Sequence, residues 1–152
     1  MKKISLVIPS YNEELNVTRF FEETEKAFSD SKYNIEYVFV NDGSKDGTLN
    51  SLKKLYNEKN ANFRIVSFSR NFGKEAAIYA GLSNATGEYT AVIDADLQQR
   101  PEVVLQMAQI LDSKPELDCV AAFQEQRKES KLLVWFQTRF YSLINRMPSV
   151  PF

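Results

Sequence analysis

The sequence of 152 residues contains no histidine and only one cysteine, Cys119. Without histidine the chain cannot form a Ser-His-Asp or Cys-His catalytic group, nor a zinc site that needs imidazole ligands. A single cysteine also excludes an internal disulfide and a thiolate-rich metal site. Because Cys119 lies in an apolar run, we expect its thiol to be buried rather than to act as a nucleophile. Any bound metal must use oxygen ligands, which favours Mg²⁺ or Mn²⁺.

The sequence also lacks an excess of either charge and any long apolar run. A formal net charge of -1 gives no electrostatic reason to expect nucleic-acid binding. No apolar run approaches the length of a transmembrane helix, and Pro9 ends the first run, residues 4–8, too early for a secretory signal. We therefore expect the chain as given to be soluble or peripheral to a membrane, and cytoplasmic.

Apolar runs and helical patterns alternate along the chain, which is typical of βαβ units. The pattern predicts a three-layer α/β/α sandwich around a mostly parallel sheet, as one domain over residues 1–152 with a core of about 1–126. Strands are predicted at residues 4–8, 35–40, 63–68 and 118–123, with another beginning at Tyr89. The first helix is predicted to start at an Asn12 N-cap, with Glu13 and Glu14 in its first turn, and a later one at Pro101.

Two aspartates, Asp94 and Asp96, follow the strand that begins at Tyr89. In a continuing strand their spacing would direct both side chains to one face, and carboxylates held together repel unless a cation or a shared proton lies between them. An acidic pair at a strand end therefore suggests a hard metal ion bound by oxygen ligands. A solvated turn explains this stretch equally well when it is taken alone.

Other polar segments are predicted to lie at the same edge of the sheet. The carboxyl ends of parallel strands meet at one edge, where open α/β sheets bind ligands. Residues 9–13, 41–44 and 94–98 all follow predicted strands. Their convergence favours a ligand site over a set of solvated turns.

Six motifs occur in order along almost the whole chain. They are Val-Ile-Pro-Ser-Tyr-Asn-Glu-Glu (7–14), Phe-Val-Asn-Asp-Gly-Ser-Lys-Asp-Gly-Thr (39–48), Arg-Asn-Phe-Gly-Lys-Glu-Ala-Ala (70–77), Ala-Gly-Leu (80–82), Ala-Thr-Gly (85–87) and Asp-Ala-Asp-Leu-Gln (94–98). With them the chain closely resembles the family 2 glycosyltransferases with the GT-A fold. Within that family it is most similar to polyprenyl-phosphate sugar transferases, such as bactoprenol glucosyltransferases and dolichol-phosphate mannose synthases.

The resemblance implies a nucleoside-diphosphate sugar as donor, UDP-glucose-like, and gives roles to particular residues. It implies a nucleotide pocket lined by Pro9, Tyr11, Glu13 and Asp42, with Asp42 recognising the base. It implies that Asp94 and Asp96 are the catalytic residues and hold Mg²⁺ or Mn²⁺ against the diphosphate, with Gln98 as a further ligand. Lys74 is expected to contact phosphate or acceptor. The alternatives are a solvated surface lysine for Lys74 and a first-turn helix acid for Glu13.

The resemblance further implies an inverting transfer to polyprenyl phosphate. Because a phosphate monoester with a pKa near about 6 is largely ionised at neutral pH, such an acceptor needs no protein base. Two rival hypotheses remain. One is a family 2 transferase with a soluble or polysaccharide acceptor, which would need a carboxylate base. The other is a catalytically silent nucleotide-sugar-binding module.

Departures from the family pattern support the second rival. Gln99-Arg100-Pro101 stands where Asp-Pro-Pro is usual, and Gln124 stands where an arginine is usual. The chain also ends at Phe152, before the usual Gly-Asp-Phe-Arg-Leu segment, so we expect a truncated or shortened form. Arg127 is a candidate to replace the missing charge.

The last predicted helix, residues 132–145, combines an aromatic and aliphatic stripe with basic residues. Such a composition suits contact with an anionic membrane surface over residues 131–146. Packing within the fold, or against a second protomer in a homo-oligomer, explains the stripe at least as well, and we slightly prefer packing.

Overall fold

The structure of this chain, a computed structural model, describes residues 1–59 and 61–122. Strands and helices alternate along it, as the sequence pattern predicts, and Met1–Ala121 forms one compact unit. The strands are β1 (Lys3–Ser10), β2 (Asn34–Asn41), β3 (Asn62–Ser67) and β4 (Tyr89–Val92). The helices are α1 (Val17–Phe28), α2 (Thr48–Glu58), α3 (Lys74–Asn84) and α4 (Pro101–Ser113).

The four strands form a single sheet in the order β3-β2-β1-β4, and every neighbouring pair is parallel. β1 aligns with β2 over its whole length, from Lys3 opposite Asn34 to Ser10 opposite Asn41. Both central strands are buried almost throughout, because helices cover a parallel sheet on both faces. The predicted α/β class with a mostly parallel sheet is confirmed.

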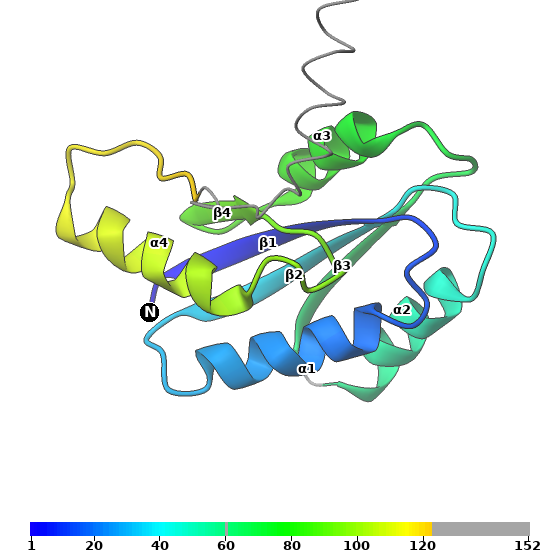
Figure 1. The fold of residues 1–152 in the computed structure, drawn as a ribbon, viewed down its shortest axis with the longest axis horizontal. Helices are drawn as coiled ribbons and strands as arrows, with labels where there is room; N and C mark the ends of the chain where they lie inside the picture. The colour runs from blue at the N-terminus through cyan, green and yellow to red at the C-terminus, as the bar shows by residue number, and fades with distance from the viewer. Residues whose placement is uncertain (60, 123–152) are drawn as a thin grey trace, which may run out of the picture. The chain divides into compact units, whose positions relative to one another are not determined.

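Helices cover the two faces of the sheet in three layers (Figure 1). On one face α1 packs against both α2 and α4, whereas α3 packs on the other face against β1, β2 and β3. The chain first places β2 and β3 on one side of β1, then crosses through α3 and adds β4 on the other side. Open α/β sheets bind ligands at such a reversal, beyond the carboxyl ends of the strands.

An aromatic cluster fixes α1 on the central strands. The rings of Tyr37, Phe39 and Phe63 stack in the sheet with centroids 5.1 to 6.2 Å apart. From α1, Phe20 meets Phe39 edge-on at 6.2 Å, and Phe21 meets Tyr37 edge-on at 5.1 Å. Each fully buried aromatic ring contributes about 1.5 to 3 kcal/mol of transfer free energy. This packing anchors the strand and helix ends from which the pocket loops leave.

The first helix begins later than the sequence predicts. Asn12 is not its N-cap, because α1 starts at Val17 after Asn16 and the Asn12 backbone has a φ of 58°. The Asn12 side chain instead accepts a hydrogen bond of 2.9 Å from the backbone N–H of Lys45. Glu13 therefore lies in a loop before the helix, and the reading of it as a first-turn helix acid is wrong.

Two predictions for residues 118–122 are also wrong. These residues form no strand, since nothing in the described ranges pairs with them, and a strand needs a neighbour for its backbone groups. Cys119 is exposed rather than buried. Its apolar neighbours indicated a core position, but this segment follows a turn after α4, and only Val120 within residues 118–122 is partly buried.

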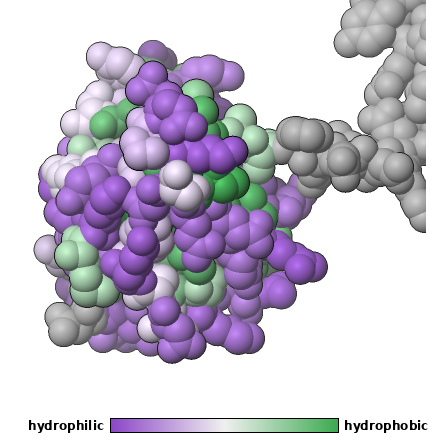
Figure 2. Space-filling model, turned by 90° about the vertical axis from the view of Figure 1, so that its left-hand side faces the viewer, coloured by the Kyte–Doolittle hydropathy of each residue, from purple (hydrophilic) through white to green (hydrophobic). Residues whose placement is uncertain are grey.

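Gln124, Arg127 and the predicted last helix lie outside the described residues. Figure 2 looks onto the side of the molecule that carries the N-terminus and α4, and shows a mainly hydrophilic surface with small separate hydrophobic areas. Across the described ranges, no helix combines the length and apolar character needed to cross a membrane.

Candidate active site

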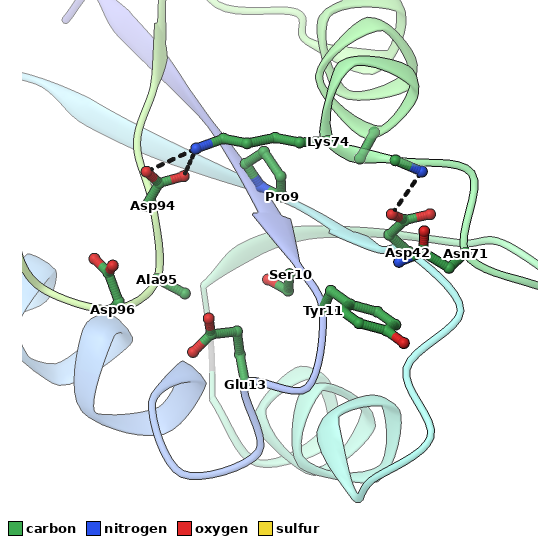
Figure 3. Close-up of a pocket in the computed structure, with 12 residues that line it drawn as sticks. Pro9, Ser10, Tyr11, Glu13, Asp42, Asn71, Lys74, Asp94, Ala95 and Asp96 are labelled. Carbon is green, nitrogen blue, oxygen red and sulfur yellow. Dashed lines mark hydrogen bonds and ion pairs between the residues drawn. The ribbon is translucent and has the colours of Figure 1, made fainter. Parts of the chain in front are cut away.

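A pocket of about 430 Å³ opens at the carboxyl ends of β1, β2 and β4 (Figure 3). The lining residues are Pro9, Ser10, Tyr11, Glu13, Asp42, Asn71, Gly73, Lys74, Ala77, Asp94, Ala95 and Asp96. Every site residue predicted from the sequence therefore lines this pocket except Gln98, which is exposed and lies outside it. The three strand ends expected to converge do so.

Asp42 builds one wall of the pocket. It is 3% exposed at the end of β2, and its two carboxylate oxygens accept backbone N–H bonds from Phe72 at 2.7 Å and Gly73 at 3.0 Å. The loop before α3 consequently lies close to the backbone at Gly43, whose φ is 62°. A Cβ added to Gly43 would be 2.2 Å from the carbonyl carbon of Arg70. A carboxylate has about four acceptor positions, so Asp42 can hold this loop and still accept from a ligand.

A set of reciprocal hydrogen bonds, the loop brace, joins residues 12–14 after β1 to residues 44–48 after β2. The bonds run from Asn12 N–H to Ser44 Oγ (3.0 Å), Lys45 N–H to Asn12 Oδ1 (2.9 Å), Glu13 N–H to Thr48 Oγ1 (2.8 Å), Glu14 N–H to Asp46 Oδ2 (3.2 Å) and Gly47 N–H to Glu14 Oε2 (3.0 Å). Tyr11 and Glu13 lie in or beside the braced segment, so their positions in the pocket are fixed by backbone contacts. The two loops thus form one continuous wall of the pocket.

Electrostatics strengthen the loop brace at Asp46. Burial alone would raise the pKa of Asp46, but hydrogen bonds from the Thr48 side chain and backbone and from the Glu14 backbone hold this pKa below its ordinary value. The ionised carboxylate is thus the form that the folded chain stabilises.

The acidic end of the pocket carries one ion pair. Lys74 Nζ lies 2.7 Å from Asp94 Oδ1 and 2.9 Å from Asp94 Oδ2, as Figure 3 shows. Asp96 points away from this lysine, and its Oδ1 accepts the backbone N–H of Gln98 at 3.0 Å. Leu97 adopts a φ of 61° in this turn, which ends the extended course of the strand and leaves Gln98 outside the pocket.

The donor set suits a hard cation only in part. Asp94 and Asp96 supply carboxylate oxygens, but the described residues contain no group of three or more acidic or cysteine side chains placed to hold a metal. Mg²⁺ and similar ions commonly take one or two carboxylates and complete their shell with water and substrate phosphate. The two aspartates therefore suit a metal ion whose remaining ligands include phosphate oxygens.

Some lining residues were not singled out from the sequence. Ser10, Ala77 and Ala95 carry no chemical signal, because their side chains are small and common in cores. Asn71 and Gly73 belong to the motif over residues 70–77, but that motif does not indicate a function for these two residues. Their place in the wall depends on the contact of this loop with Asp42, which no spacing rule reveals.

The fold and pocket define the chain as a doubly wound α/β protein with a polar site at its strand reversal, the arrangement of nucleotide-binding proteins. Residues 5–149 match the sequence model described as "Glycosyl transferase family 2". The chain belongs to this family.

Curated relatives extend well beyond this chain. An uncharacterized glycosyltransferase of Synechocystis sp. is 39% identical over 150 residues, which cover 97% of this chain and 46% of that protein. The dodecaprenyl-phosphate galacturonate synthase of Rhizobium johnstonii is 35% identical over 131 residues, covering 86% of this chain and 38% of that protein. The chain thus spans less than half the length of these relatives.

Solved structures support the fold. The mannosyltransferase PcManGT from Pyrobaculum calidifontis, in complex with GDP-Man and Mn²⁺, matches with a TM-score of 0.61 and 23% identity over 72% of this chain and 32% of its own. S. aureus TarS in complex with UDP-GlcNAc matches with a TM-score of 0.58 and 23% identity over 85% of this chain and 39% of its own. At this identity the likeness shows the GT-A glycosyltransferase fold, as the sequence resemblance implied.

Proposed function

We propose that this chain is the donor-binding part of a metal-dependent, inverting glycosyltransferase that moves a sugar from a nucleoside-diphosphate sugar to polyprenyl phosphate. The observation that carries the proposal is the pocket, in which Asp42 lies at one end while Asp94 and Asp96 lie at the other. A long, polar ligand with a hydrogen-bonding base and a charged diphosphate matches this distribution of groups.

The base would bind beside Asp42 and Tyr11. Asp42 keeps acceptor capacity for the imide N–H of uracil or the N–H donors of guanine. Tyr11 is 42% exposed at the pocket, and the loop brace holds its loop in place. Glu13 and Pro9 line the pocket between this end and the acidic end (Figure 3). The neighbours with GDP-Man and UDP-GlcNAc support a nucleotide sugar without deciding between the two bases.

Asp94 and Asp96 would hold Mg²⁺ or Mn²⁺, the latter being the ion named with PcManGT. Such an ion, when bound, neutralises charge that develops on the leaving nucleoside diphosphate. The residues themselves orient the diphosphate end: Asp94 comes from the end of β4, and Lys74 from α3 faces it across the pocket. Gln98 would have to move to act as a ligand, because it lies outside the pocket.

A lipid phosphate is the acceptor that asks least of this pocket, although its carboxylates could also serve as a base toward a hydroxyl acceptor. Neither histidine nor cysteine lines it, and a phosphate ionised at neutral pH needs no base from the protein. Its oxygen would form a bond to the anomeric carbon from one side as the bond to the diphosphate oxygen breaks on the other, and the nucleoside diphosphate leaves with the electron pair. The relative named dodecaprenyl-phosphate galacturonate synthase supports this class of acceptor, which would place the reaction at the cytoplasmic membrane surface.

Calorimetric titration tests the donor site directly. The full chain is titrated with UDP-glucose, UDP-GlcNAc and GDP-mannose, each with Mn²⁺ or with EDTA. We expect metal-dependent binding of at least one donor, weakened at least about ten-fold in Asp96→Ala, since even the outer partners of metal ligands are typically worth about 10- to 100-fold. Asp118→Ala removes an exposed aspartate outside the pocket and serves as the matched control. Absence of binding to any of the donors would overturn the proposal.

A further inference from the structure

Lys74 occupies an unusual electrostatic position. It is the first residue of α3, at the positive end of the helix dipole, where a cationic side chain is disfavoured. The residue before it, Gly73, provides no side-chain cap, so the backbone N–H groups of the first turn add to this positive field. Three carboxylates offset this positive charge. Glu75 lies in the same first turn, Asp42 accepts the Gly73 N–H, and Asp94 pairs with the lysine itself.

The Lys74–Asp94 pair also covers a place that a divalent cation would need. The ammonium group contacts both oxygens of Asp94, at 2.7 and 2.9 Å, whereas within residues 1–59 and 61–122 no lysine pairs with Asp96. A cation bound between the two aspartates would compete with Lys74 for Asp94 and would be repelled by its charge. The pair is only partly buried, with side chains 56% and 31% exposed, so Lys74 has room to leave.

The two carboxylates alone cannot complete a metal coordination shell. Binding of an ion to the nucleotide-free pocket therefore breaks the Lys74–Asp94 pair, and the described residues give that ion only these two carboxylates in return. An ion that enters with a diphosphate gains phosphate oxygens, and the same diphosphate offers Lys74 a new anionic partner. The exchange of partners then costs little, because each charged group ends with an opposite charge.

We infer that Lys74 is a counterion that suppresses metal binding to the nucleotide-free pocket and transfers from Asp94 to the diphosphate when the nucleotide binds. This inference rests on the proposed function, since it takes the metal and nucleotide sites as assigned there. Metal and nucleotide should then bind with positive coupling, and each should raise the affinity for the other by the same factor. Part of that coupling should depend on Lys74.

Replacing Lys74 with methionine separates the two halves of the inference. Lys74→Met keeps an unbranched side chain and removes the charge. In the absence of nucleotide we expect Mn²⁺ to bind roughly two- to ten-fold more tightly, because the competing ion pair and the repulsion are both removed. In EDTA we expect UDP to bind more weakly by a similar factor. Electron paramagnetic resonance counts free Mn²⁺, and calorimetry measures UDP binding, so neither readout requires activity.

Opposite changes in the two affinities are the signature of a partner exchange. A merely structural role for Lys74 would weaken both ligands together and lower the melting temperature. Lys74→Arg keeps the charge and should restore weak Mn²⁺ binding, whereas Lys54→Met, which removes an exposed lysine on α2, should change neither affinity.

The inference and the proposed function fail in different ways. If the unaltered chain binds UDP with Mn²⁺ but Lys74→Met does not bind Mn²⁺ more tightly, the counterion role is wrong and the donor site stands. If no nucleotide binds to the unaltered chain at all, the proposed function fails and the inference fails with it.

Discussion

Two aspartates at opposite edges of the sheet are held in very different ways. Asp112, at the end of α4, lies at the amino ends of the strands and is bound from four sides. Its partners are Lys2 Nζ at 2.5 Å, Lys32 Nζ at 2.8 Å, the Tyr33 hydroxyl at 2.6 Å and the Tyr89 hydroxyl at 2.8 Å. Asp94, at the carboxyl ends, pairs with one lysine in the part of the chain that the structure describes.

The difference shows which edge is available to a ligand. Hydrogen bonds from Lys2 and then Lys32 hold the pKa of Asp112 far below its ordinary value, and burial together with Asp112 raises the pKa of Tyr33 to about 12. These groups join the start of β1, β2 and β4 to α4, and they leave Asp112 little capacity for another partner. At the other edge Asp94 and Asp96 face a pocket, and contacts among the described residues leave acceptor positions on both carboxylates unused. A saturated carboxylate stabilises the fold, whereas an unsaturated one is free to bind.

Asp42 offers the most severe test of this contrast, because it lies at the ligand edge and yet holds two backbone groups. Asp42→Ala leaves the Phe72 and Gly73 N–H groups without their acceptor, so we expect the free energy of unfolding to fall by about 2 to 4 kcal/mol. Urea unfolding followed by circular dichroism measures this, with Asp118→Ala as control. Unchanged stability would show that position at the edge, rather than the number of partners, decides the role of a carboxylate.

Exchanging the two aspartates for asparagine should separate stability from binding. Asp112→Asn keeps the shape but removes the charge that two lysines share, so we expect the melting temperature to fall by several degrees with unchanged affinity for UDP and Mn²⁺. Asp94→Asn should weaken that affinity at least about ten-fold, since a metal ligand is lost, and should change the melting temperature far less. Scanning calorimetry measures the melting temperatures of the two variants, and titration calorimetry measures their affinities for UDP and Mn²⁺. A loss of affinity in Asp112→Asn would contradict the contrast.

Acid should destabilise the fold mainly through Asp112, at the amino ends of the strands. The folded pKa of Asp112 lies below its unfolded value, near about 3.9, so the folded chain binds fewer protons than the unfolded chain there. The stability from this group is therefore complete above about pH 4 and is lost as the pH falls toward the folded pKa. We expect the melting temperature to decline below about pH 4, and to decline less steeply in Asp112→Asn. Equal slopes in the two proteins would show that other carboxylates control acid unfolding.

The sequence predicted the central part of the fold well because the relevant forces are local. β1 and β2 are apolar runs that end in polar turns, and such runs have few alternatives to a buried parallel strand. Pro101 fixed the start of α4 for the same kind of reason, since its ring suits a first helical turn. The convergence of Asp42, Asp94 and Asp96 followed from topology alone.

The failures concern groups whose partners are distant in the sequence. Asn12 has the composition of an N-cap, but its side chain binds Lys45, thirty-three positions away. The lysine partner of Asp94 likewise comes from another element, so no spacing rule could identify Lys74 as its counterion. The stretch over residues 118–122 reads as a strand, but strand formation depends on a neighbour, which local pattern does not supply.

The smallest effect is expected in the loop brace, where each contact is one of several. Asn12→Gly keeps the left-handed backbone and removes only the side-chain bond to Lys45, worth about 0.5 to 1.5 kcal/mol. Asn12→Ala removes the same bond and adds about 1 kcal/mol of backbone strain. If the loop brace positions Tyr11 for the nucleotide, UDP affinity should fall by roughly two- to three-fold in the glycine variant and further in the alanine variant. Equal losses in the two variants would show that the side-chain bond alone sets the geometry of this wall. No loss in either would show that the remaining bonds hold Tyr11 without it.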